Sequence, residues 1–218
     1  FDGLDDYIEI NNNANYNNTL TIFASIKTSN TSGSPQAIFS GGCGDFTFDI
    51  VDGLLRFYKQ CDGSTVTWGS TSVNDGLWHQ VVAVLNENIV QIYVDGNLDN
   101  WEYQSWTPSS NEFLTIGNSI VNSQYDEHFT GMIDNVQLWD IVLSEEDIQQ
   151  YMNCPPSGYE SGLHSYWGLN EGYGDFIIGT GTENNGTING AIYSEDVPEQ
   201  NCSNTNIEEI EGFTYLAS

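Results

Sequence analysis

Basic residues are almost missing from this sequence. Its 218 residues include three lysines and arginines against 31 aspartates and glutamates, which gives a formal net charge of −28 at pH 7. Nucleic acids and anionic membranes bind proteins through lysine and arginine, so this surface would repel both. A strongly acidic surface attracts divalent cations instead and stays soluble where salt is high. The charge balance therefore predicts no nucleic-acid partner and favours a saline habitat.

Long hydrophobic runs are missing as well. No stretch holds the roughly 20 consecutive apolar residues of a membrane-spanning helix, so we predict no direct membrane insertion. No secretory signal pattern is present either. Because Phe1 already lies in a strand-like run, we expect any signal peptide to have been removed or to lie upstream.

Cysteine is scarce and scattered, with no C-x-x-C pair and no histidine at zinc-site spacing. The four residues are Cys43, Cys61, Cys154 and Cys202. An even, dispersed number in an Asn-, Thr- and Gly-rich chain is typical of two disulfides in an extracellular, oxidising compartment. Of the three pairings that four cysteines allow, we favour Cys43–Cys61, across a strand-turn-strand segment, and Cys154–Cys202, which would tie the C-terminal part back onto the domain. The alternative is four reduced, buried thiols.

Short runs of β-branched and aromatic residues recur along the chain between clusters of Gly, Asn, Asp and Ser. Many alternate apolar with polar residues, as half-buried antiparallel strands do. Val81–Leu85 and Ile89–Asp95 flank a hairpin-length turn, and Gly96 follows as a residue free to take positive φ. With almost no helix, this spacing predicts an all-β fold, a two-sheet antiparallel jelly-roll sandwich. The other expected strands are Tyr7–Ile10, Leu20–Lys27, Ala37–Ser40, Phe46–Ile50, Leu54–Lys59, Phe113–Ile116, Ile133–Trp139, Leu163–Leu169 and Thr187–Ser194.

One short helix is predicted near residues 144–152. Ser144 precedes Glu145, Glu146 and Asp147, a capping-box-like start with carboxylates in the first turn, where the helix dipole favours them. Pro155 ends the helix. We expect one sandwich over residues 1–202, in which residues 157–202 add C-terminal strands tied back by a disulfide. Residues 203–218 are predicted to be a linker and the start of a following domain.

Four segments resemble a known family in their order along the chain. They resemble, in turn, the opening strand, the central W-H-x-V strand, the Y-V-D-G turn and the F-x-G-x-I-D-x-V strand of laminin-G-like domains in the concanavalin A-like lectin/glucanase superfamily. The ending of the fourth segment, with the helix after it, is similar to that of pentraxins. The resemblance implies a jelly roll that recognises a ligand. The segments are Phe1–Ile10, Gly76–Val82, Ile92–Gly96 and Phe129–Trp139.

The C-terminal part carries a second resemblance. Gly162–Ala191 is similar to a piece that accompanies such domains in surface proteins of marine Bacteroidetes. The closing Gly212–Ser218 faintly resembles the first strand of a C-type lectin domain. Both imply a longer, cell-surface protein with neighbouring domains.

Calcium is the expected cofactor, either structural or ligand-bridging, although the chain has no EF-hand pattern. The laminin-G resemblance implies Asp5, Asp6 and Asp134 as cation-side residues. The alternative is that Asp5 and Asp6 cap a turn and that Asp134 accepts a hydrogen bond from a backbone amide. The pentraxin resemblance implies Asp126 and Glu127 as ligands, but the consecutive acidic and amide ligands of pentraxins are replaced at residues 118–120 by Asn-Ser-Ile.

Aromatic residues in polar stretches are the candidate sugar contacts. Trp101, Tyr103 and Trp106 fall within residues 100–109, and Trp68 lies in another polar stretch. Aromatic rings stack on the C–H faces of sugars, and exposed rings of this size require an explanation. The alternative is that one of them folds over the edge of the sandwich.

Catalytic motifs are missing. The glycoside hydrolases of this superfamily carry E-x-D-x-x-E, and the nearest match, Glu145–Gln150, lacks the final Glu and begins the predicted helix. No G-x-S-x-G motif is present. We therefore predict a non-catalytic binding module of a secreted or cell-surface adhesin, which recognises a glycan or another surface with calcium support. The alternatives are a spacer domain that displays its neighbours without a ligand of its own, and an accessory module of a polysaccharide-degrading enzyme.

Overall fold

Two antiparallel sheets form the molecule, as the sequence predicts. The computed structural model describes residues 1–12, 18–62, 66–104, 106–109, 113–121, 124–125, 127–181 and 184–202. The eight-stranded sheet has the order β15 (Phe176–Ile177), β17 (Gly186–Asn189), β1 (Tyr7–Asn11), β10 (Phe113–Ile116), β3 (Gln36–Ser40), β4 (Phe46–Val51), β5 (Leu54–Lys59) and β6 (Val66–Ser72).

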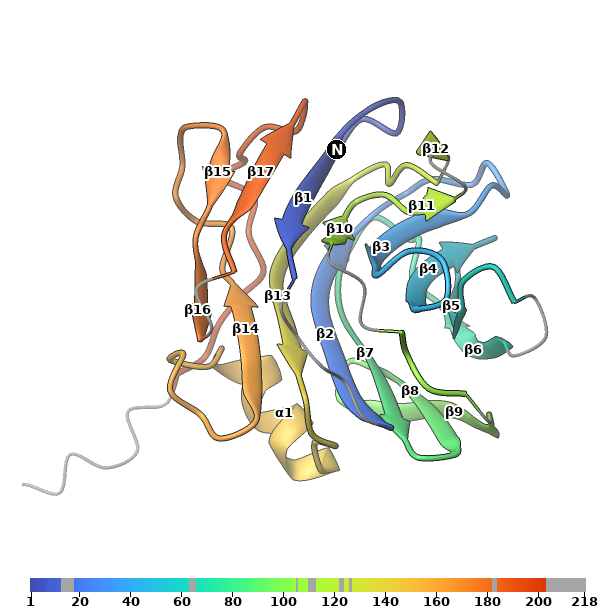
Figure 1. Ribbon diagram of the computed structural model, residues 1–218. Helices are drawn as coiled ribbons and strands as arrows, with labels where there is room; N and C mark the ends of the chain where they lie inside the picture. The colour runs from blue at the N-terminus through green and yellow to red at the C-terminus, as the bar shows by residue number, and fades with distance from the viewer. Residues whose placement is uncertain are drawn as a thin grey trace, which may run out of the picture.

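The second sheet has seven strands, and the helix covers its outer side (Figure 1). A two-stranded hairpin, β11 (Ile120–Val121) and β12 (Gln124–Tyr125), lies next to β3. The seven strands are, in order, β16 (Gly179–Gly181), β14 (Leu163–Trp167), β13 (Met132–Trp139), β2 (Thr19–Lys27), β7 (Trp78–Asn86), β8 (Ile89–Val94) and β9 (Asn97–Tyr103).

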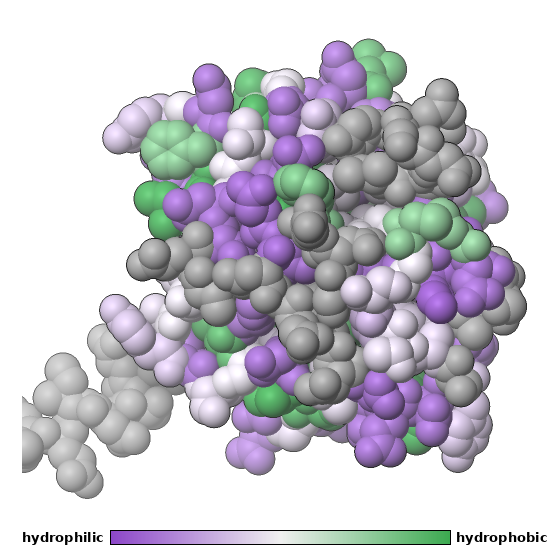
Figure 2. Space-filling model, viewed as in Figure 1, coloured by the Kyte–Doolittle hydropathy of each residue, from purple (hydrophilic) through white to green (hydrophobic). Residues whose placement is uncertain are grey.

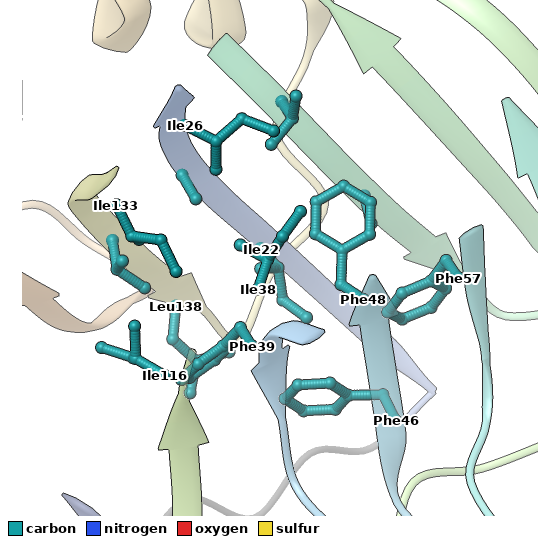
Figure 3. Close-up of a cluster of buried hydrophobic side chains, with 14 of the residues drawn as sticks. Ile22, Ile26, Ile38, Phe39, Phe46, Phe48, Phe57, Ile116, Ile133 and Leu138 are labelled. Carbon is teal, nitrogen blue, oxygen red and sulfur yellow. The ribbon is translucent and has the colours of Figure 1, made fainter. Parts of the chain in front are cut away.

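The main core lies between the two sheets. On β4, Phe46 and Phe48 alternate with polar residues, so both rings point inward. They meet Phe57 of β5, whose ring centroid lies 6.1 Å from each of theirs, and aliphatic side chains from the other sheet, including Ile22 and Leu138 (Figure 3). All five side chains are fully buried, and the burial of apolar surface of this kind is the dominant favourable term in folding.

A second core cluster holds α1 (Glu145–Asn153) on the outer face of the seven-stranded sheet. Ile148 of α1 is buried with Phe23 of β2 and Trp139 of β13. The Trp139 ring lies 4.7 Å, centroid to centroid, from the ring of Tyr151 on the helix. The helix thus covers an apolar area that the sheet would otherwise expose.

The capping box at the start of α1 is present as predicted. The Asp147 backbone N–H donates to Ser144 Oγ over 3.2 Å, and the Ser144 N–H donates to Asp147 Oδ2 over 3.1 Å. The helix ends at Asn153, one residue beyond the predicted range.

Ser144→Ala is expected to lower the free energy of unfolding by about 1 kcal/mol, because the N-terminal amides of the helix lose their acceptor. Urea unfolding measures the change. Ser34→Ala, at an exposed loop serine, is the matched control and should be neutral. An equal effect of both substitutions would contradict the capping role.

Two strands lie where the sequence predicts only polar connections. Residues 66–72 form β6 and residues 97–103 form β9, and each strand lies at one edge of its sheet. Their Ser, Thr and Asn residues hide the alternation by which strands are recognised. The strands form because β5 and β8 present unpaired backbone groups to them, and a buried amide requires a partner.

Both disulfides of the favoured pairing are formed. Cys43 is joined to Cys61, and Cys154 to Cys202. Residues 190–202, here called the C-terminal strap, run from β17 to Cys202. Asp196 Oδ2 of the strap lies 2.6 Å from Lys27 Nζ, and its Oδ1 accepts a hydrogen bond from Trp78 Nε1 over 2.9 Å. The strap is thus anchored on the seven-stranded sheet. Residues 203–218, predicted as a linker, lie outside the described residues.

Candidate functional site

A group of charged and aromatic side chains lies on the outer face of the eight-stranded sheet. The strand register places Asp49 of β4 opposite Arg56 of β5, and Arg56 opposite Trp68 of β6. Because cross-strand partners point to the same side, these three side chains stand in a row on the face away from the core. With Tyr58 and Glu127 they form what is here called the polar patch.

Arg56 is the centre of the polar patch. Its Nε donates to Asp49 Oδ1 over 2.9 Å, and its Nη2 contacts the second oxygen of Asp49. Its guanidinium carbon lies 4.4 Å from the ring centroid of Tyr58 and 5.5 Å from that of Trp68. The planar cation is therefore held between two rings by cation–π attraction, with its direction fixed by the carboxylate.

Burial governs the protonation of the patch. It raises the pKa of Asp49 to about 7, although the hydrogen bonds and the charge of Arg56 oppose the shift. Burial also raises the pKa of Tyr58, and the negative charges of Asp49 and Glu127 raise it further. Tyr58 consequently keeps its proton and can donate a hydrogen bond, which it gives to Glu127 Oε2 over 3.5 Å.

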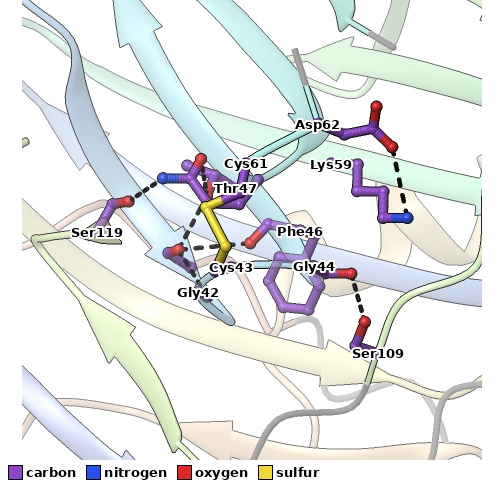
Figure 4. Close-up of a disulfide and its surroundings, with 12 residues drawn as sticks. Gly42, Cys43, Gly44, Phe46, Thr47, Lys59, Cys61, Asp62, Ser109 and Ser119 are labelled. Atoms are coloured by element: carbon purple, nitrogen blue, oxygen red, sulfur yellow. Dashed lines mark hydrogen bonds and ion pairs between the residues drawn. A yellow bond between two sulfur atoms is a disulfide. The ribbon is translucent and has the colours of Figure 1, made fainter. Parts of the chain in front are cut away.

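The segment around the β11–β12 hairpin is pinned to the same face. Glu127 O accepts a hydrogen bond from Ala37 N over 2.8 Å, and Glu127 N donates to Asn118 Oδ1 over 3.2 Å. Gln60 Nε2 donates to Ser119 Oγ over 2.9 Å, beside the Cys43–Cys61 disulfide (Figure 4). Asn118 and Ser119 are fully buried, so these residues hold the loop in place. Asp126, expected from the pentraxin resemblance as a ligand, lies outside the described residues.

The aromatic residues singled out in the sequence are divided between two faces. Trp68 is 38% exposed and belongs to the polar patch. Trp101 and Tyr103, 48% and 75% exposed, lie on β9 with ring centroids 5.5 Å apart. Their cross-strand partners on β8 alternate with residues of the core, so both rings lie on the outer face of the other sheet. The three rings therefore do not share one face of one sheet.

Trp106 belongs to the core, and its placement among the surface aromatics is corrected. It is only 8% exposed, and its ring centroid lies 5.8 Å from that of Phe57. Its Nε1 has no hydrogen-bond partner in the part of the chain that the structure describes. The ring closes the space between the sheets near their edge, which is the alternative the sequence left open.

Asp99 of β9 holds the strand segment that follows Trp68. Its carboxylate accepts hydrogen bonds from Ser70 N over 2.6 Å and from Thr71 Oγ1 over 2.6 Å. Burial would raise the pKa of Asp99, but these bonds to Ser70 and Thr71 outweigh it and lower the pKa. Asn100 Nδ2 also donates to Trp68 O over 2.9 Å. The outer strands of the two sheets are thereby linked beside the patch.

Three carboxylates gather near the start of the chain. Oxygen atoms of Asp2, Asp5 and Asp6 all lie within 4.8 Å of one another. Asp6 is buried, and its Oδ2 accepts a hydrogen bond from Asp2 N over 2.8 Å. Among the described residues, Asp134 is not a member of this group.

Asp134 lines a small cavity instead. The cavity has a volume of about 70 Å³ and is bounded also by Phe1, Trp78 and Tyr193. Burial raises the pKa of Asp134 to about 6. Its Oδ1 accepts a hydrogen bond from the Asn135 amide over 2.7 Å, as the alternative interpretation of the sequence expects.

A second hollow lies in the C-terminal part. It is lined by Tyr159, Phe176 and Ile178, all of them exposed. The space-filling view shows hydrophobic surface on the side of the molecule where β15 lies (Figure 2). Tyr159 is almost fully exposed, which makes it a useful reference aromatic for mutation.

Both ring nitrogens of His79 face carboxylates. Its Nδ1 lies 2.9 Å from Asp95 Oδ2, and its Nε2 lies 3.1 Å from Asp75 Oδ1. Burial would lower the pKa of His79, but the two carboxylates outweigh it and raise the pKa. With both ring nitrogens engaged, the imidazole has no nitrogen left to accept a proton from a substrate. The pairing joins the turn before β7 to the turn after β8.

Comparison with known proteins identifies the architecture. Residues 1–149 match a family model described as the concanavalin A-like lectin/glucanases superfamily, laminin-G type. No curated protein matches the sequence. No helix in the described part of the chain is long and apolar enough to cross a membrane.

Three solved structures show the same fold at low sequence identity. A "putative carbohydrate binding protein" from Bacteroides ovatus superposes with a TM-score of 0.73 at 18% identity, over 91% of this chain and 62% of that one. A heptameric SAP-like pentraxin from Limulus polyphemus gives 0.55 at 17%, over 69% and 78%. The CBM40 module of a Ruminococcus gnavus sialidase, bound to α2,3 sialyllactose, gives 0.55 at 17%, over 63% and 84%. The chain thus spans less than two thirds of the length of the Bacteroides protein.

Proposed function

Because the chain belongs to the concanavalin A-like lectin/glucanases superfamily, we propose that it is a non-catalytic glycan-binding module of a secreted or cell-surface protein. The observation that carries the proposal is Trp68, an exposed ring fixed beside Arg56 on the outer face of a sheet. Carbohydrate-binding proteins among the structural neighbours support the same function.

The polar patch has the chemistry that a sugar requires. The Trp68 ring offers an apolar surface to C–H groups, while the Glu127 carboxylate accepts hydrogen bonds from hydroxyls. Arg56 is already fixed by Asp49 and by two rings, so little conformational entropy is lost when a ligand binds. A few oriented polar groups beside an aromatic ring are typical of small-molecule sites.

Trp68→Ala is expected to weaken glycan binding by about tenfold or more, since a central aromatic contact contributes at least about 1.4 kcal/mol. A glycan array followed by titration calorimetry measures the change. Trp101→Ala and Tyr159→Ala, at exposed aromatics on other surfaces, are the matched controls.

Each outcome assigns a site or rejects one. Loss of binding only in Trp101→Ala or Tyr159→Ala would move the site to that surface. If the unaltered protein binds no glycan, a display role within a larger adhesin becomes the better hypothesis. Release of sugar from a polysaccharide would show an enzyme instead.

We further propose calcium support at Asp2, Asp5 and Asp6. The donor set fits, because three carboxylates within 4.8 Å of one another can supply the oxygen ligands that calcium prefers. A bound ion would neutralise their mutual repulsion.

Calcium at about 100 times its dissociation constant should stabilise the fold by about 2.7 kcal/mol, which raises the melting temperature by about 5 °C or more. Thermal unfolding with calcium and with EDTA measures the difference. Asp5→Asn should abolish the difference in melting temperature between calcium and EDTA, whereas Asp134→Asn should leave it unchanged. An unchanged midpoint in EDTA would count against a structural ion.

A further inference from the structure

Arg56 is the basic side chain of the polar patch, and it is already paired with a carboxylate. The sequence has three basic residues in all, Lys27, Arg56 and Lys59, and the structure describes each of them. Lys27 pairs with Asp196, Arg56 with Asp49 and Lys59 with Asp62. Each of the three therefore already has a carboxylate as its nearest partner.

The three histidines also contact neighbouring polar groups. Both ring nitrogens of His79 face carboxylates. Nε2 of the buried His164 lies 2.9 Å from Asn184 Nδ2. Nδ1 of His128 lies 3.4 Å from Asp6 O. The N-terminus of α1, where an anion could dock, begins with three acidic residues of its own.

We propose that the ligand of this module is an uncharged saccharide, and that glycans carrying carboxylate or sulfate groups are excluded. This inference rests on the proposed glycan-binding function and specifies its ligand class. An anionic sugar needs a cation or a set of free amides to replace its hydration shell, and it must approach a protein with a net charge of −28. Sugar hydroxyls, in contrast, donate hydrogen bonds to the carboxylates that dominate this surface.

The R. gnavus module bound to α2,3 sialyllactose shares the fold of this chain. A likeness at 17% identity shows the fold alone, so the proposed ligand class of this chain rests on its own paired basic residues. The likeness to that module suggests that sialylated glycans bind, whereas the paired basic residues suggest that they do not.

The test compares matched glycans that differ only in their charged groups. Suitable pairs are lactose with 3′-sialyllactose, and methyl-esterified with de-esterified polygalacturonate. Binding is measured by titration calorimetry and by affinity electrophoresis, with and without EDTA. For any pair that binds, we expect the charged member to bind about tenfold more weakly or not at all, since like charges in contact are strongly unfavourable. The difference in affinity between the charged and the neutral member should become smaller at 1 M NaCl, where the Debye length falls to about 3 Å.

Two variants test the role of the ion pair directly. Asp49→Asn leaves Arg56 without its partner, so the charged member should gain affinity relative to the neutral one. Glu199→Gln, at an exposed residue, changes the net charge by the same amount but leaves all three basic residues paired, so it should not alter the affinity of the charged member relative to the neutral one. Circular dichroism and urea unfolding confirm that both variants are folded.

Tighter binding of the charged member by the unaltered protein, with or without EDTA, would overturn the inference while supporting glycan binding. The affinity of the charged member relative to the neutral one could also rise equally in both variants. Net charge alone would then determine the selectivity, and the role of the Arg56–Asp49 pair would be overturned. If neither member of any pair binds, the proposed function itself fails, and the inference fails with it.

Discussion

Replacing Cys154 and Cys202 together with serine is expected to lower the free energy of unfolding by about 4 kcal/mol, the loop-entropy value for a separation of 48 residues. The disulfide closes a loop that contains β14 to β17 and the C-terminal strap. Without it, the strap would keep only non-covalent anchors, among them the exposed ion pair between Lys27 and Asp196. Such a pair contributes little by itself.

Urea unfolding of the non-reduced proteins measures this effect. The matched variant replaces Cys43 and Cys61, which are separated by 18 residues, and should lose about 3 kcal/mol. We also expect proteases to cut the first variant more readily, because the end of the strap would be held only by non-covalent links such as the hydrogen bonds from Asn201 N to Asn153 O and from Gln200 Nε2 to Asn135 Oδ1. A smaller loss in the first variant than in the second would show that the strap is not closed by its disulfide.

Trp167→Ala is expected to destabilise the fold by about 3–5 kcal/mol, as truncation of a fully buried indole does. Trp167 lies on β14 with no exposed surface, and its ring centroid is 5.7 Å from that of Phe39 in the opposite sheet. It is the main aromatic contact between the C-terminal strands and the principal core. The cavity left by the ring cannot collapse easily, because strands hold it on both sides.

Trp167→Phe separates packing from hydrogen bonding. The indole Nε1 donates to Asn184 O over 2.6 Å, and phenylalanine would leave that carbonyl without its donor. A loss of about 1–3 kcal/mol is expected from this change, partly through the unsatisfied carbonyl. Chemical denaturation measures both variants, and Trp101→Ala, at an exposed ring, should be nearly neutral. If Trp167→Ala leaves the free energy of unfolding almost unchanged, the C-terminal strands do not unfold cooperatively with the rest of the sandwich.

The sequence predicted the central strands well and the outer strands poorly, for a physical reason. Central strands such as β2 and β4 bury β-branched and aromatic residues, so their composition and alternation are both visible. β6 and β9 have a sheet neighbour on only one side, and polar residues such as Ser70 and Asn100 satisfy them by hydrogen bonding. No hydrophobic periodicity marks strands of that kind.

The candidate site was found only in part. The sequence indicated Trp68, as an aromatic in a polar stretch, and Glu127, as a calcium ligand, but it did not indicate Asp49, Arg56 or Tyr58. A signal existed: the inward residues of β4, Phe46 and Phe48, imply that the residues between and after them face outward. Which outward residues meet across strands depends on the register, and the register is not visible in a single sequence.

The disulfide between Cys154 and Cys202 also determines how the molecule would respond to mechanical load. Tension applied to the chain beyond Cys202 is transmitted through the disulfide to Cys154, at the end of α1. The 48-residue loop between the two cysteines would not be extended, because the sulfur–sulfur bond bypasses it. The pull would instead reach α1 and β13, which are held by the aromatic contact of Trp139 with Tyr151. Single-molecule extension should therefore show a contour length shorter by that loop than the number of residues implies.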